Sequence, residues 1–141
     1  MSSRLLPEFN LKPGDYGWTG QFPEGPHRLF GKDVSLEIHT RMTANDPKVL
    51  PPVSPSQAAL VGSIVPVLSS LLRRVESELT AYNRKFDPEF HAVISHPQVW
   101  LSCESDDGVS WTFIVGRTDN PNFGYDMEFR GTDFVQFCAG Y

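Results

Sequence analysis

The chain has 141 residues, of which 40% are hydrophobic and 21% charged; this composition is typical of one folded domain and excludes a disordered chain. The net charge of −5 is divided unequally, because residues 1–86 carry +2 and residues 87–141 carry −7. An acidic C-terminal part repels phosphate backbones and attracts cations and basic proteins, so we expect a basic protein partner and no nucleic-acid binding.

Two features of the sequence bear on where the protein works. The N-terminal residues lack the apolar stretch of a secretory signal, so we expect a cytoplasmic protein. The longest weakly polar stretch, residues 58–72, is shorter than the roughly 18–20 residues of a membrane span, so no membrane association is predicted. Cys103 and Cys138 are predicted to be buried free thiols within strands, with a disulfide as the alternative.

The N-terminal third is predicted to contain an irregular arm over residues 1–15 and strands within residues 16–42. Aromatic and small residues alternate in residues 16–22, and a clearer alternation follows, in which every second residue is apolar or Thr: Val34, Leu36, Ile38 and Thr40. This period is that of a strand with one buried face. His39 lies on the other face and is expected to be exposed.

A long helix is predicted over residues 54–86. Ser54 is a favourable N-cap, Pro55 suits the first helical position, and Gln57 completes a capping box. Apolar residues then recur every three or four positions, which indicates a continuous stripe that packs on the core. Pro66 cannot donate a backbone hydrogen bond, so we expect a kink near residues 62–66 or a short helix followed by a longer one.

Residues 98–140 read as antiparallel strands joined by short turns. Aromatic and aliphatic residues alternate with polar ones on both sides of the turn-like segment 118–124. Taken together, the sequence predicts a single α+β domain, residues 1–141, in which one long helix packs on a largely antiparallel sheet of about five to six strands.

The first functional hypothesis is an acidic surface on the C-terminal strands and turns that binds a basic protein. Acidic residues and neighbouring aromatic residues make up the predicted patch: Asp106, Asp107, Asp119, Phe123, Tyr125, Asp126 and Glu128. Such patches orient a charged partner and accelerate its association. We predict no catalytic residue and no cofactor for this function, and we expect a monomer or a homodimer.

The alternative hypothesis is a small metal-dependent enzyme. Carboxylate and imidazole side chains that can bind a transition metal are clustered just after the helix: Asp87, Glu89, His91 and His96. In an extended chain the first three would point the same way. A third hypothesis is a small-molecule pocket between the helix and the aromatic sheet.

The order of elements resembles a group of small bacterial α+β proteins of unknown function, some of them with toxin-immunity roles. The similarity lies in the strand around Trp18, the strand after Phe30-Gly-Lys, the helix that opens Ser54-Pro-Ser-Gln-Ala-Ala, and residues 124–135. The resemblance implies a non-enzymatic cytoplasmic protein that binds another protein, and it implies no catalytic residues.

Overall fold

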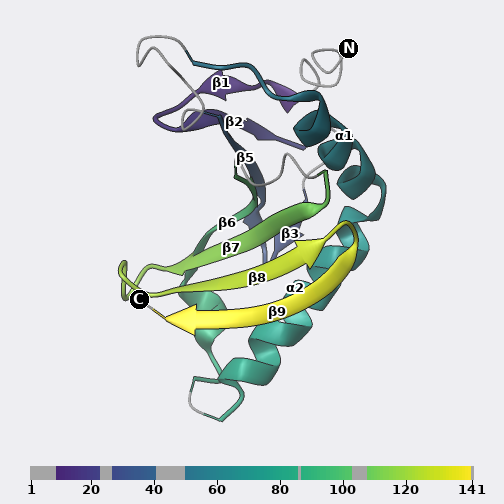
Figure 1. Cartoon of the computed structure of the whole chain (residues 1–141). Coiled ribbons are helices and arrows are strands. Elements are labelled where there is room, and N and C mark those ends of the chain that lie inside the picture. Colours follow the sequence, from purple (N-terminus) through teal and green to yellow (C-terminus); the bar gives the residue numbers. More distant parts are fainter. Residues whose placement is uncertain (1–8, 23–26, 41–49, 86, 103–107, 141) are drawn as a thin grey trace.

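The computed structural model describes residues 9–22, 27–40, 50–85, 87–102 and 108–140. It contains a curved seven-stranded sheet with helices on one side and a separate two-stranded sheet (Figure 1). The strands are β1 (Lys12–Pro13), β2 (Gly17–Gln21), β3 (Arg28–Leu29), β4 (Lys32–Asp33), β5 (Ser35–His39), β6 (Ile94–Leu101), β7 (Ser110–Arg117), β8 (Gly124–Arg130) and β9 (Asp133–Gly140). The helices are α1 (Pro55–Ile64) and α2 (Leu68–Asn83), with short 3-10 turns η4 (Val65–Val67) and η5 (Phe90–Ala92).

The large sheet has the order β1-β2-β5-β6-β7-β8-β9, so the predicted α+β class is confirmed and the strand number is slightly higher than expected. All neighbours pair antiparallel except β5 and β6, which run parallel with Leu36 opposite Val99. The helical segment connects these two strands. A crossover of this kind is what parallel neighbours require, because a short turn reverses the direction of the chain.

The helix begins at the predicted cap. The Gln57 backbone N–H donates to Ser54 Oγ at 3.1 Å, and the Ser54 N–H donates to Gln57 Oε1 at 3.0 Å. Pro66 lies in η4, which separates the shorter α1 from the longer α2 and confirms the expected break. Helix α2 ends at Asn83, three residues before the predicted end.

The core lies between the helices and the inner face of the sheet. The predicted alternation of β5 is confirmed, because Leu36 and Ile38 are fully buried and Val34 and Thr40 are nearly so. Helix residues three or four positions apart complete this core: Leu60, Ile64, Leu68, Leu71, Val75 and Leu79. Each large apolar side chain of this kind contributes about 1.5–3 kcal/mol when it leaves water, so the core fixes which face of the sheet is left uncovered.

By length and composition, the helical segment Pro55–Asn83 is apolar enough to cross a membrane. The core helix of a globular protein passes the same test, and here the apolar stripe of the helix packs on the sheet.

Candidate functional site

The uncovered face of β7, β8 and β9 carries two carboxylates side by side, which we call the outer acidic face: Asp126 and Glu128 of β8. Residues of β8 alternate between buried and exposed, so the same pattern that buries Met127 places these two acids outward. Asp126 lies opposite Ile114 of β7 and Cys138 of β9. The two carboxylates therefore form a row along one strand, with uncharged neighbours on both sides.

The cation nearest in sequence to the outer acidic face is Arg130, which is exposed on β8 two positions after Glu128. Among the described residues, no Lys or Arg side chain forms an ion pair with Asp126 or Glu128. Partial burial of the carboxyl, together with the charge of Glu128, raises the pKa of Asp126 above its ordinary value. A cation placed beside these residues would favour the ionised form of both carboxylates.

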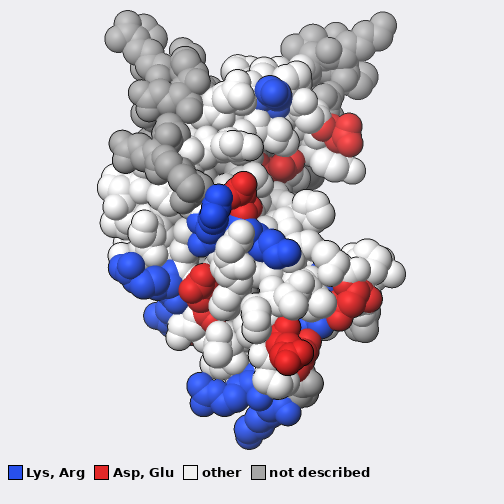
Figure 2. All heavy atoms as spheres, turned by 180° about the vertical axis from the view of Figure 1, so that it is seen from behind, with Lys and Arg blue, Asp and Glu red and all other residues white. Residues whose placement is uncertain are grey.

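The side of the molecule opposite to the view of Figure 1 is different. Figure 2 shows basic and acidic side chains next to one another there. On α2, for example, Arg74 Nε lies 2.9 Å from Glu78 Oε2. Helix α2 thus carries charges of both signs, and some of them pair with each other.

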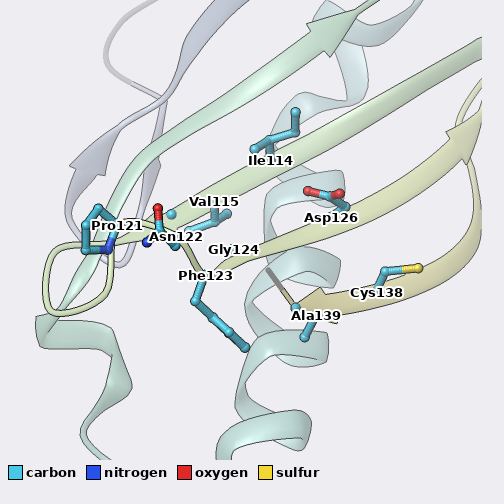
Figure 3. Close-up of a pocket in the computed structure, with 11 residues that line it drawn as sticks. Ile114, Val115, Pro121, Asn122, Phe123, Gly124, Asp126, Cys138 and Ala139 are labelled. Carbon is cyan, nitrogen blue, oxygen red and sulfur yellow. The ribbon is translucent and has the colours of Figure 1, made fainter.

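A hollow of about 480 Å³ adjoins the outer acidic face (Figure 3). Asp126 lies on its wall between Ile114 and Cys138, and Phe123 and Pro121 from the β7–β8 loop lie at the other side. A wall that is mainly apolar and contains one carboxylate suits the side chain of Lys or Arg, in which an apolar stem carries a charged head.

The structure places the predicted partner-binding residues in different environments. Asp126 and Glu128 lie on the outer face, and Phe123 lines the hollow. Tyr125 is fully buried, so its predicted role as a surface residue is wrong; in the alternation of β8 its side chain points inward. Asp119 is bound to Arg117. Asp106 and Asp107 lie outside the described residues.

Arg117 is the centre of a second polar group, the Arg117 cluster, which consists of Arg117, Asp87, Asp119, Tyr125 and Asn83. Its Nη2 donates to Asp87 Oδ2 and to Asp119 Oδ2, each at 2.7 Å, and its Nε donates to Asp119 Oδ1 at 2.8 Å. Arg117 Nη1 donates to the Tyr125 hydroxyl at 2.8 Å, and that hydroxyl donates to Asn83 Oδ1 at 3.3 Å. The cluster joins the end of α2 to β7, β8 and the loop between them.

The guanidinium of Arg117 is bound by the two carboxylates and the tyrosine hydroxyl of the cluster. The hydrogen bonds to Asp119, and then those to Asp87 and Tyr125, raise the pKa of Arg117 above its usual range despite the opposing effect of burial. Arg117 in turn holds the pKa of Asp119 below its ordinary value. A guanidinium that already binds two carboxylates attracts little further anionic ligand, so we interpret the cluster as a structural clamp.

The predicted metal-binding residues are not brought together. Asp87 binds Arg117, Glu89 is exposed, and the ring of His91 lies against Phe30 and Phe90. His96 lies in β6 at an irregularity in the register and has a positive φ of 50°. Over the described part of the chain, no three His, Cys, Asp or Glu side chains are grouped so that they would hold a metal ion.

The expectation that His39 is exposed is also wrong. Its side chain is 17% exposed, accepts a hydrogen bond at Nε2 from Trp100 Nε1, and stacks on Tyr16. Burial lowers the pKa of His39. The parallel pairing of β5 with β6, which no local pattern predicts, creates this environment.

The predicted burial of Cys138 is wrong, because this free thiol is exposed. Cys103 lies outside the described residues.

Arg117 was missed as a key residue. One signal was present in the sequence. After position 86 the chain has nine acidic residues and two arginines, Arg117 and Arg130, and Asp119 follows Arg117 by two positions.

Comparisons with protein-family models, with curated proteins and with solved structures found no match to this chain.

Proposed function

We propose that this chain is a non-catalytic bacterial cytoplasmic domain, related in role to immunity proteins, that binds a basic protein through the outer acidic face. The observation that carries the proposal is the pair Asp126 and Glu128, which lies on the uncovered face of the sheet without a cation partner among the described residues. By contrast, an arginine pairs with each of four other acids: Asp33, Glu78, Asp87 and Asp119.

The hollow beside Asp126 supports a partner that inserts a Lys or Arg side chain. Its apolar wall residues, among them Ile114 and Phe123, would pack against the stem of such a side chain. The Asp126 carboxylate would meet the charged head. The raised pKa of Asp126 would fall back toward its ordinary value on binding, so that binding releases protons in the pH range in which the free carboxyl titrates.

Charge complementarity of this kind affects association more than dissociation. Exposed charges are screened over about 8 Å at physiological ionic strength. We therefore expect the association rate with a basic partner to fall steeply as salt is added, while the dissociation rate changes little.

The test is affinity capture from bacterial lysate at low salt with three baits: the wild type, the double variant Asp126→Lys/Glu128→Lys, and the control Asp15→Lys/Glu89→Lys. The control makes the same change in net charge at other exposed positions. We expect a basic protein that is recovered by the wild type and the control and lost from the Asp126/Glu128 variant. Circular dichroism of all three baits verifies that each is folded.

The recovered protein is then purified and its binding measured directly against salt concentration. A toxin-like basic protein encoded beside this chain would be the first candidate for that measurement. If the Asp126/Glu128 variant recovers the same proteins with the same affinity as the wild type, the proposed function is rejected.

A further inference from the structure

Strand β9 ends the large sheet. It pairs with β8 on one side, from Arg130 opposite Asp133 to Gly124 opposite Gly140, and no strand in the described part of the chain pairs with its other side. Figure 1 shows β9 along the rim of the sheet. The opposite rim is β1, which has two residues, whereas β9 has eight. The rim at β9 therefore offers a much longer row of backbone donors and acceptors.

Natural edge strands are usually protected by Lys, by Pro, by a bulge or by being short. Strand β9 contains no Lys, Arg or Pro, and its one charged residue is Asp133 at its start. A register shift falls opposite Glu128 and Phe129, and after it the pairing is regular from Gln136 to Gly140. This uncharged segment of five residues is the part of the edge that can accept another strand.

The edge lies directly beside the outer acidic face. Gln136 is opposite Glu128, and Cys138 is opposite Asp126, so these pairs share one face of the sheet. A strand added to β9 would lie two strand spacings, about 10 Å, from β8. Lys or Arg side chains on its outward positions would lean over the shorter Cys138 and Gln136 toward the two carboxylates. Asp126 and Glu128 are two residues apart, which matches the spacing of outward side chains on such a strand.

We propose that β9 accepts an extended segment of the basic partner as an eighth strand of the sheet, and that Lys or Arg at alternate positions of this segment pairs with Asp126 and Glu128. This inference rests on the proposed function and specifies its partner as a basic strand. Strand addition supplies affinity through backbone hydrogen bonds and specificity through alternate side chains.

A second copy of the chain is the competing occupant of the same edge. Two copies joined through β9 would each bring the same acidic face and a net charge of −5. Like charges oppose that pairing, and opposite charges favour a basic strand. The negative charge of the outer acidic face therefore favours a basic strand over a second copy of the chain at the edge of β9.

The test uses synthetic peptides of nine residues in which Lys alternates with Thr or Val, and the full-length protein. The first control peptide has the same sequence with alternate backbone amides N-methylated, which removes the donors of one edge and leaves the charges intact. The second has the same composition with its Lys residues grouped at one end. Binding is measured by titration calorimetry, and amide hydrogen exchange of residues 136–140 is followed in parallel.

We expect the alternating peptide to bind and to slow amide exchange in Gln136–Gly140. N-methylation should weaken binding by about tenfold or more, since several backbone hydrogen bonds are lost. Grouping the Lys residues, or changing Asp126 and Glu128 to Lys, should also weaken it by about tenfold. The variant Cys138→Lys, which places a Lys on the edge and also beside Asp126, should reduce binding because it affects both the edge and the acidic face.

The outcomes separate this inference from the proposed function. Equal binding of the N-methylated and unmodified peptides, with loss in the Asp126/Glu128 variant, overturns strand addition and leaves the acidic face as the binding surface. Equal binding by wild type and that variant rejects the role of the acidic face. Absence of peptide binding, or self-association that Cys138→Lys abolishes, overturns the basic strand as the occupant of the edge.

Discussion

The Arg117 cluster and the outer acidic face use the same kind of residue in opposite ways. In the cluster, Asp87 and Asp119 are both held by one guanidinium at 2.7 Å, whose positive charge offsets part of their negative charge within the fold. On the outer face, Asp126 and Glu128 have no such partner among the described residues, and burial raises the pKa of Asp126. Acidic residues close together in the sequence can therefore stabilise the fold in one place and remain available to a partner in another.

The replacement Arg117→Ala should have the largest effect on stability. It leaves two carboxylates and the buried Tyr125 hydroxyl without their shared donor, which should lower the free energy of unfolding by about 2–3 kcal/mol. Urea denaturation followed by fluorescence measures this change. The control is Arg130→Ala, an exposed residue near Ser110, which should change stability by less than about 0.5 kcal/mol. Equal effects of the two replacements would contradict the role of the cluster as a clamp.

The next largest effect is expected for Tyr125→Phe. The replacement keeps the ring in the core but removes the hydroxyl that accepts from Arg117 and donates to Asn83, at a cost of about 1 kcal/mol. Peptide binding should be unchanged, since the ring is fully buried. A loss of binding without a loss of stability would show that Tyr125 belongs to the binding surface after all.

Asp119→Asn should lower stability at neutral pH, and the difference from wild type should shrink in acid. Arg117 lowers the pKa of Asp119 in the folded protein, so the folded state binds fewer protons than the unfolded state. The stabilisation by ionised Asp119 is complete above its unfolded pKa of 3.8 and is lost as the pH falls through the lower folded value. Urea unfolding between pH 7 and about pH 2 tests this, because the loss occurs below pH 3.8. A constant difference would argue against the ion pair.

Asp126→Asn should have the smallest effect on stability, and of the opposite sign. The folded pKa is raised, so ionisation of Asp126 costs the folded state stability as the pH rises from 3.8 through the folded value. At pH 7 the variant should be as stable as the wild type or slightly more so, while its binding of the alternating peptide is weakened. A clear loss of stability would place Asp126 with the clamp residues.

The sequence predicts the fold well where one local pattern decides the structure. The alternation of Leu36 and Ile38, the cap at Ser54 and the break at Pro66 all depend on neighbours within a few positions. The parallel pairing of β5 with β6 depends on residues about 60 positions apart, and no local pattern specifies it. The partly buried position of His39 follows from that pairing and was missed for the same reason.

The candidate site was predictable in part. Period-two alternation in β8 is enough to place Asp126 and Glu128 on one face and Tyr125 on the other. The partnership of Asp87 with Arg117 requires knowledge of how the end of α2 meets β7. A count of charges cannot distinguish an acid that is paired across elements from one that is not.

The parallel pair of β5 and β6 also has a consequence for how the chain folds. The antiparallel strands β1, β2 and β5 come from the first 39 residues, and they join the rest of the sheet only through β6, which begins at Ile94. During synthesis this N-terminal unit must wait until the whole helical segment and β6 have left the ribosome. Closing such a long loop is slow compared with forming the β6–β9 meander, so we expect the C-terminal strands to form first and the N-terminal strands to dock last.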